Sequence, residues 1–256
     1  VRNGKIVSVG TSTAIPANAP VIDLGDATLL PGFLDAHTHI TEEMHADWKQ
    51  DFIDGFQKTT AEKTLIASVY ARKTLLAGFT TLRNLGASDF IDVGLRNAIR
   101  DGVVPGPRLL TATIAIGSLG GHCDPTGGLA PDVLPEPDFK LGIISGPDQA
   151  RQAVRYVTKH GADVIKVCAT GGVLSLTDDV DTAQLTQAEL DAIVAESHEL
   201  RRKAAAHAHG ATGAKRAIRA GIDSTEHGTF LDEEALQMMK EHGTYLIPPL
   251  MALKGI

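Results

Sequence analysis

Two His-x-His pairs are the residues of this 256-residue chain best suited to chemistry. His37 and His39 form the first pair, and His207 and His209 form the second. Successive side chains of a β-strand point to opposite faces, so the two imidazoles of each pair share a face and can approach one ion. Imidazole is the commonest protein ligand for transition metals. We therefore expect both pairs to lie at strand ends and to line a metal site.

Lys166 lies inside an apolar stretch, Val164-Ile165-Lys166-Val167-Cys168. Lysine is seldom buried, and a neighbouring dication would repel its ammonium group. One interpretation is a lysine at the edge of the strand that pairs with an acid. We favour a second interpretation, in which the amine reacts with carbon dioxide. The resulting carbamate is an anion, and its two oxygens can bridge two metal ions.

Two further histidines stand where chemistry is expected. His227 ends the run Ser224-Thr225-Glu226-His227, and His122 follows Gly120 and Gly121 in a glycine-rich turn. A histidine taken alone is more often an ordinary polar residue. We expect that ordinary role for the four that remain, namely His45, His160, His198 and His242.

The elements that must position these residues alternate regularly from residue 29 onward. Apolar periodicity and turn residues predict strands over 29–37, 80–85, 108–116, 164–170, 204–209, 224–227 and 244–250. Strand alternating with helix implies a parallel sheet. Seven such periods, with polar residues at the strand ends, favour a (β/α)8 TIM-type barrel, since barrel enzymes place their chemistry at that rim. We expect an α/β fold whose barrel covers residues 29–256, with about seven strands, truncated at strand seven.

Helical patterns fill the intervals between the predicted strands. Residues 62–77 place Leu65, Ile66, Val69 and Leu76 at helical spacing. Thr186 and Glu189 form a capping box ahead of another helix, and Gly221 and Gly243 suit the ends of the next two.

The first residues do not follow this rhythm. Residues 1–10 predict a strand, an Asn-Gly turn and a second strand, and residues 21–24 predict a short third strand. We interpret residues 1–28 as part of a small β-sandwich domain attached before the barrel.

Composition narrows the possible partners. The chain has 24 basic and 31 acidic residues, a net charge of −7 and no Lys/Arg-rich run, so we expect no nucleic-acid partner. No apolar run approaches the length of about 18 residues that spans a bilayer, so we expect no membrane association. Cys123 and Cys168 are too few for a disulfide framework, and no Cys-x-x-Cys pair offers a structural zinc site. We expect a cytoplasmic protein.

Four motifs together resemble the amidohydrolase superfamily. They are Pro31-Gly32-Phe33-Leu34-Asp35-Ala36-His37-Thr38-His39, then Val164-Ile165-Lys166-Val167 with Ala169-Thr170-Gly171-Gly172, then Ala206-His207-Ala208-His209-Gly210, and Thr225-Glu226-His227-Gly228. They are most similar to its prolidase-like branch of Xaa-Pro dipeptidase or imidazolonepropionase-like metal-dependent hydrolases. The resemblance covers nearly the whole chain and implies a binuclear centre, usually zinc, in a distorted TIM barrel.

The resemblance also implies a role for each candidate residue. His37 and His39 would bind the first metal, Lys166 would bridge as its carbamate, and His207 and His227 would bind the second. His122 would contact the scissile carbonyl, although a turn histidine bonded to backbone is the alternative. In the branch a tyrosine often contacts the substrate carboxylate where this chain has His209, so His209 is expected either to bind that carboxylate or to brace a loop.

This combination predicts a metal-dependent hydrolase, acting on the amide C–N bond of a dipeptide or N-acyl amino acid. Two cations would lower the pKa of a bridging water, and the resulting hydroxide would attack the carbonyl. Deaminases and imidazolonepropionase use one metal without the lysine, so Lys166 argues against them. A lactonase or phosphotriesterase shares the binuclear centre, and a non-catalytic barrel relative is a further alternative. Substrate selectivity is expected to reside in loops such as residues 118–146 and 172–184.

Two departures from the family pattern are visible. The family has an aspartate at the end of its eighth strand, and this chain ends at what resembles strand seven, so we expect a piece of a longer enzyme that is inactive alone. Arg83-Asn84 replaces the Arg-Asp pair usual after strand two.

The expected partners are a small-molecule substrate and further copies of the chain in a homo-oligomer.

Overall fold

A computed structural model describes residues 1–11, 14–43 and 47–250 of the chain. The chain divides into two units, Val1–Pro31 and Gly32–Ile256, which we describe separately. His45 lies outside the described residues.

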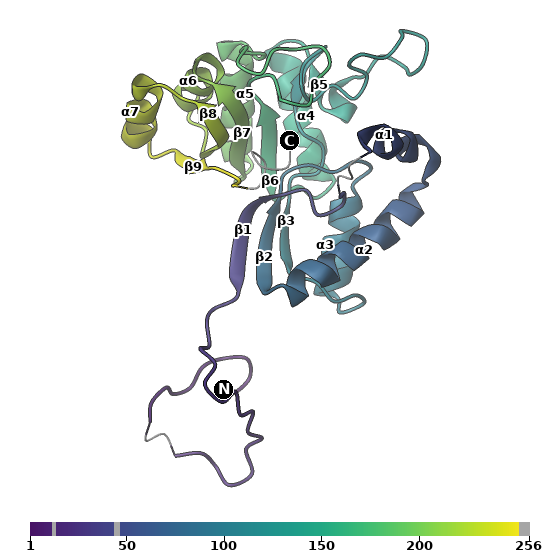
Figure 1. Cartoon of the computed structure of the whole chain (residues 1–256). Helices are drawn as coiled ribbons and strands as arrows, with labels where there is room; N and C mark the ends of the chain where they lie inside the picture. Colours follow the sequence, from purple (N-terminus) through teal and green to yellow (C-terminus); the bar gives the residue numbers. More distant parts are fainter. Residues whose placement is uncertain (12–13, 44–46, 251–256) are drawn as a thin grey trace. The chain divides into compact units, whose positions relative to one another are not determined.

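Two parallel sheets form the centre of the second unit (Figure 1). The first has the order β1 (Phe33–Thr38), β2 (Phe79–Asn84) and β3 (Arg108–Thr111), and the second has the order β6 (Val164–Cys168), β7 (Lys203–Gly210), β8 (Ser224–Phe230) and β9 (Tyr245–Ile247). All pairings within them are parallel, so the predicted α/β class with parallel strands is confirmed. Each of these strands overlaps one predicted range.

The segment after β3 joins the two sheets. Ile116 pairs in parallel with Val167, donating its N–H to Lys166 O and accepting from Cys168 N. The third predicted strand nevertheless stops at Thr111, because Thr113 has a left-handed φ of 64° that ends the extended backbone. Short strands β4 (Gly117–Ser118) and β5 (Ile143–Ile144) pair beyond it.

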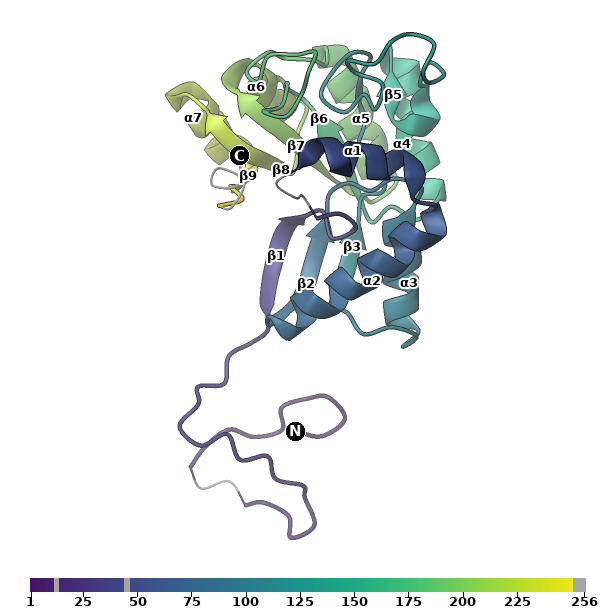
Figure 2. The same cartoon turned by 45° about the vertical axis from the view of Figure 1, so that its right-hand side comes forward.

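Helices pack along the sheets in neighbouring pairs. They are α1 (Trp48–Gln57), α2 (Thr60–Leu76), α3 (Ile91–Arg100), α4 (Pro147–Lys159), α5 (Gln187–Glu199), α6 (Ala211–Arg219) and α7 (Glu233–His242), with a 3-10 turn at Phe139–Leu141. Figure 2 shows α2 and α3 side by side along the first sheet. The Thr186–Glu189 capping box is present, and Gly243 caps α7 with a φ of 71°, as predicted.

The helix expected over residues 62–77 forms, but its large apolar residues point outward. Leu65, Val69 and Leu76 are 70%, 63% and 68% exposed, whereas Ala67 and Ala71 are fully buried. The small alanines let the helix lie close to the sheet, so the core on this side is filled by neighbours such as Leu82 and Leu95. Periodicity identified the helix, and the size of the inward residues set its orientation.

The main core lies between the second sheet and its helices. Ile165 and Val167 of β6 pack there with Ile193 of α5 and Ile218 of α6, and all four are fully buried. This packing fixes the strand ends that are described below. Among the described residues no helix is both long and apolar enough to cross a bilayer.

The first unit contains less regular structure than its sequence predicts. Arg2 and Lys5 exchange backbone hydrogen bonds across Asn3 and Gly4, whose φ values of 51° and 72° make the expected Asn-Gly turn. The strand expected at residues 21–24 is absent from the described part of this unit. A strand needs a neighbour for its backbone groups, and residues 21–24 have no paired strand among the described residues of the unit.

Candidate metal centre

The predicted site residues come together at the carboxyl ends of parallel strands. His37 lies near the end of β1 and His39 just after it, Lys166 lies in β6, and His207 lies in β7 beside His227 of β8. Carboxyl ends of neighbouring parallel strands meet at one edge, where α/β enzymes hold their catalytic groups. The fold therefore assembles residues from the two ends of the second unit's sequence.

Ring contacts connect the histidines continuously. The ring centroid of His37 is 5.5 Å from that of His39 and 4.8 Å from that of His227. The His227 ring is in turn 4.6 Å from His207, and His207 is 4.2 Å from His122. These five imidazoles, which come from four segments of the chain, therefore share one site.

His209 belongs to the same cluster. One ligand atom from each of His207, His209 and His227 lies within 4.8 Å of the others. The Nδ1 atom of His209 is 2.9 Å from Thr229 Oγ1, and its buried Nε2 atom has no hydrogen-bond partner within the described structure. An unpartnered buried nitrogen is costly unless a metal or substrate uses it. The donor set therefore fits a divalent metal, and His209 is open either to the metal or to substrate.

The backbone of His227 explains how its ring reaches this cluster. Its φ is 69°, and the β7–β8 pairing shifts register between Ala208 and Gly210. Histidine is one of the few residues other than glycine found in the left-handed region with some frequency, and such strained positions concentrate at functional sites. The turn directs the imidazole of His227 toward His207 and His209.

Lys166 is buried, with 4% of its surface exposed. Within the described residues its ammonium group makes no hydrogen bond or ion pair, so the interpretation as a lysine paired with an acid receives no support. Burial lowers the pKa of Lys166 to about 8, the negative charge of Glu226 opposes this, and the charge of Arg83 adds to it. About a tenth of the amine is then neutral at pH 7, and the neutral amine is the nucleophilic form.

Glu226, which lies in the motif Thr225-Glu226-His227-Gly228, is a further candidate residue of the site, and the sequence alone did not reveal its role. It is fully buried, and its Oε2 atom is 2.9 Å from Nδ1 of His37. Its Oε1 atom accepts hydrogen bonds from Arg83 at 2.7 Å and Ser224 at 2.6 Å. A carboxylate bonded to Nδ1 of a histidine fixes the tautomer that leaves Nε2 as the ligand atom. The sequence did contain a sign of this role, because Glu226 is an acidic residue inside a predicted strand and directly precedes the candidate ligand His227.

Charge supports this arrangement. Burial alone would raise the pKa of Glu226, but the hydrogen bond from His37 and the positive charges of Arg83 and Lys166 lower it overall.

The pKa values of the histidines are lowered as well. Burial, followed by the charge of Lys166, lowers the pKa of His37 and of His39. Burial, then the charge of His37, lowers the pKa of His227 to about 2. Burial, then the charge of His122, holds the pKa of His207 well below its usual value. All these imidazoles are neutral near neutral pH, which is the form that binds metal.

His122 is held against the site by a second loop. Its Nδ1 atom is 2.8 Å from Ser175 Oγ, and its backbone N–H donates to Gln184 Oε1 at 2.9 Å. A Cβ atom at Gly172 would lie 2.1 Å from Nδ1 of His122, so this glycine lets the backbone approach the ring. Burial lowers the pKa of His122 to about 4, against the effect of Asp178. The alternative of a turn histidine bonded only to backbone does not describe this ring.

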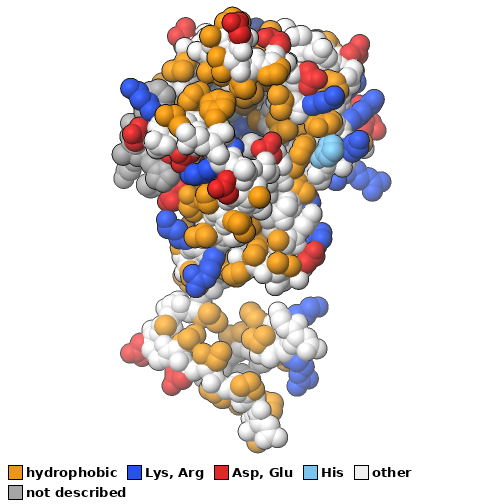
Figure 3. Space-filling model, turned by 90° about the vertical axis from the view of Figure 1, so that its right-hand side faces the viewer, with side chains coloured by type: hydrophobic (Ala, Val, Ile, Leu, Met, Phe, Trp, Pro, Cys, Tyr) orange, Lys and Arg blue, Asp and Glu red, His pale blue; other side chains and the backbone are white. Residues whose placement is uncertain are grey.

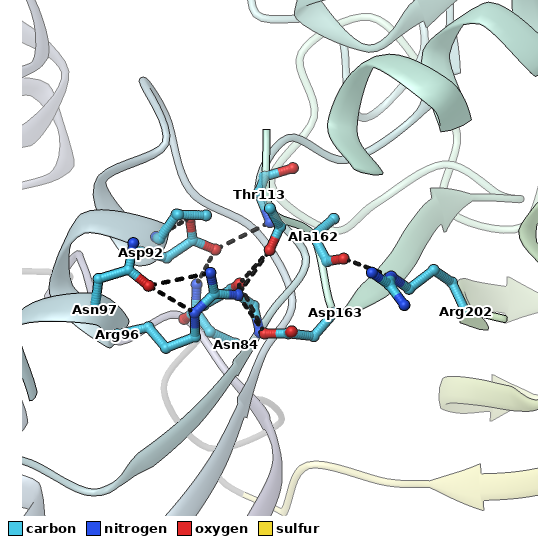
Figure 4. Close-up of polar contacts among 11 residues, drawn as sticks. Asn84, Asp92, Arg96, Asn97, Thr113, Ala162, Asp163 and Arg202 are labelled. Atoms are coloured by element: carbon cyan, nitrogen blue, oxygen red, sulfur yellow. Dashed lines mark hydrogen bonds and ion pairs between the residues drawn. The ribbon is translucent and has the colours of Figure 1, made fainter. Parts of the chain in front are cut away.

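Asn84, the departure noted in the sequence, connects the site to a buried polar network (Figure 4). Its Oδ1 atom accepts from the N–H of Ile40, directly after His39, at 2.7 Å. Its amide nitrogen donates to Asp92, a fully buried carboxyl whose pKa is raised by burial. An aspartate at position 84 would face Asp92 with a second carboxylate, whereas the amide donates a hydrogen bond to it. Arg96 makes a second set of polar contacts, with Thr111 and Asp163, and its positive charge opposes the rise in the pKa of Asp92.

The two cysteines also meet beside the site. Cys123 follows His122, Cys168 ends β6, and they form a disulfide with Cα atoms 6.1 Å apart. Two cysteines make no framework, but this single crosslink joins the His122 loop to the strand of Lys166.

The other described histidines lie elsewhere, as predicted. His198 pairs with Asp223 on the surface, and the ring of His160 at the end of α4 packs against Phe90. His242 ends α7.

Comparison with known proteins agrees with this geometry. Residues 28–254 match the model of the amidohydrolase family. Ochratoxinase from Aspergillus niger is 34% identical over 226 residues, which are 84% of this chain and 46% of the relative. The crystal structure of a Xaa-Pro dipeptidase with bound methionine is 41% identical and superposes with a TM-score of 0.81 over 85% of this chain and 53% of that one. A prolidase complexed with N-methylphosphonate-L-proline is 31% identical, with a TM-score of 0.79 over 91% of this chain and 56% of that one. The chain thus spans about half the length of these relatives.

Proposed function

This chain belongs to the amidohydrolase family, and on that premise we propose that the whole protein hydrolyses the amide C–N bond of a dipeptide or N-acyl amino acid. The observation that carries the proposal is the gathering of neutral imidazoles around the buried Lys166 at one strand edge. The similarity to a Xaa-Pro dipeptidase and to a prolidase supports a substrate of the peptide type.

We infer that the site holds two divalent ions, with zinc favoured because its ligands are commonly imidazole nitrogens and anionic oxygens. His37 and His39 would hold one ion, and His207 and His227 the other. When bound, such ions acidify a water molecule and polarise a carbonyl. Glu226 supports this assignment by bonding Nδ1 of His37, which reserves Nε2 for the ion.

Lys166 would join the two ions as its carbamate. The neutral amine attacks the carbon of CO2, forms a C–N bond and releases one proton to water, leaving an anion on the side chain. Burial and a pKa of about 8 supply the neutral amine, and no described residue bonds Nζ, so the amine is available to react. The anion would be stable between two cations, since they invert the ordinary preference of a buried site for neutral groups.

His122 and His209 would act on the substrate. His122, whose ring contacts that of His207 from the loop after β4, would donate a hydrogen bond to the scissile carbonyl oxygen. His209 offers a buried Nε2 atom, unpartnered within the described structure, to a terminal carboxylate. We further propose that the two sheets belong to one (β/α)8 barrel, which the Ile116–Val167 bridge between them supports.

The test compares the full-length enzyme with its His209→Ala variant. Each is assayed on an N-acyl amino acid and on the corresponding C-terminal amide, with metal content measured alongside. The wild type should prefer the free acid, and the variant should lose that preference while retaining its metal. A wild type that prefers the amide, or hydrolyses neither, overturns the substrate class.

A further inference from the structure

Large apolar side chains are exposed on two adjoining helices, away from the metal centre. We call this surface the α1–α2 face: Phe52, Ile53 and Phe56 of α1, and Leu65, Val69 and Leu76 of α2, all of them exposed. Phe52 and Phe56 pack edge to face with ring centroids 5.1 Å apart. Lys63 of α2 donates a hydrogen bond to Gly55 O of α1, so the two helices are in contact. Figure 3 shows hydrophobic side chains between charged ones on the side of the molecule where these helices lie.

The exposure of these three leucine and valine side chains follows from the way α2 is oriented on the sheet. The helix buries Ala67 and Ala71 and turns Leu65, Val69 and Leu76 to the opposite side. Scattered exposed apolar residues are ordinary, but a stripe of them along one face of a helix is typical of an interaction site. Within the described residues the core does not use these side chains, and no described element covers them.

The charges on the same stripe indicate what that surface is. Glu62 lies near the start of α2 and Arg72 near its end, on the helix face that carries Leu65 and Val69. If a second α2 runs antiparallel across a two-fold axis near residue 67, Leu65 meets the partner's Val69. In the same register Glu62 meets the partner's Arg72. A two-fold contact requires such self-complementarity, because the same patch is used by both copies.

We propose that the α1–α2 face is the contact between two copies of this chain, with α2 packed antiparallel against α2 of the second copy. In this contact the two Glu62–Arg72 pairs lie at the edges of the apolar stripe of α2. The proposal is independent of the reaction at the metal centre.

The test uses the full-length protein and measures its mass in solution over a wide range of concentration. Wild type should be a dimer or a larger even assembly, and Leu65→Glu with Val69→Glu should weaken association about tenfold or more. Val103→Glu is the matched control, since Val103 is 75% exposed and lies outside the face. Retained metal content shows that each variant is folded.

A charge exchange tests the register. Glu62→Arg and Arg72→Glu should each weaken association, and the double variant should recover it. Because Glu62 also caps α2 through Thr59, Glu62→Gln, which can keep the cap, separates loss of charge from loss of the cap. A monomeric wild type, a dimer that survives Leu65→Glu with Val69→Glu, or a double variant without recovery overturns the proposal. A monomer that instead binds a different protein through this face overturns it equally.

Discussion

At the residue scale, the least expected feature is a buried carboxylate that makes no predicted contact with metal or substrate. Glu226 is fully buried between His37, Arg83 and Ser224. Its negative charge therefore acts only on these three neighbouring side chains. It fixes the tautomer of His37 and neutralises the guanidinium of Arg83.

Glu226→Gln should accordingly weaken metal binding while leaving every ligand in place. Replacing an outer partner of a ligand histidine costs about 10–100-fold in metal affinity. Removing one charge of a buried pair also lowers the free energy of unfolding, by about 3 kcal/mol. Competition with a chelator and urea unfolding measure the two effects. Asp101→Asn, which removes the exposed partner of Arg100, is the control and should change neither.

Lys166→Ala should lose metal and activity together, because the proposed bridging anion disappears. Short-chain carboxylic acids added to the variant should restore part of both, since a carboxylate can occupy the space of the carbamate. Elemental analysis and turnover with and without acetate are the measurements. An active Lys166→Met enzyme would falsify the carbamate.

Residue types and spacing identified the histidines and Lys166 as a set because they lie in, at the ends of, or just after predicted strands. Glu226 and Arg83 could not be assigned in the same way. Their role depends on the distance between β1, β2 and β8, which no local pattern encodes. The choice between metal and substrate for His209 likewise depends on which nitrogen lacks a partner.

At the element scale, loops that meet over the strand ends determine where His122 lies. Gly172 begins the loop after β6 and contacts the His122 ring directly. Gly172→Ala would place a methyl group 2.1 Å from Nδ1 of that ring, so the ring must move. We expect the maximal rate to fall about tenfold or more with metal content unchanged, because His122 is proposed to act on the substrate and not on the metal.

Gly94→Ala is the matched control for this substitution. Gly94 lies in α3, where an added Cβ atom would meet nothing within 4 Å, and its φ is not positive. The same change there should stabilise the helix by up to about 1 kcal/mol and leave the rate unaltered. A full rate for Gly172→Ala would show that the loop accommodates the methyl group and that His122 is not held by this contact.

The elements themselves were largely predictable, because alternation of strand and helix leaves strong periodic signals. The errors have physical causes. The third strand stops early at the left-handed Thr113, and residues 21–24 lack a neighbouring strand within the described part of their unit. The spacing of Leu65, Val69 and Leu76 predicted a helix, and the helix forms. Periodicity alone does not say which face of a helix is buried when the opposite face carries small apolar residues such as Ala67 and Ala71.

At the scale of the whole molecule, gathering so many basic groups in one place makes the fold sensitive to acid. In the metal-free protein burial lowers the pKa of His122 to about 4 and that of His227 to about 2, whereas an unfolded histidine titrates near 6.5. Between pH 6.5 and 4 the unfolded chain therefore binds protons that the folded chain does not. Lys166 does not contribute to the pH dependence of stability between pH 6.5 and 4. Its pKa is lowered only to about 8, so the lysine is protonated in both the folded and the unfolded chain in that range.

The free energy of unfolding of the metal-free protein should therefore fall as pH falls from about 6.5 to about 4. Each such histidine contributes a slope of up to about 1.4 kcal/mol per pH unit. Urea unfolding at several pH values measures this slope. His227→Asn should make it shallower, because asparagine accepts the same left-handed backbone without titrating. Gly94→Ala, which changes no titrating group, is the control and should leave the slope as it is. A stability that is flat or rises toward acid would mean that the imidazoles are protonated in the fold, and such a cluster would not be ready to bind a metal at neutral pH.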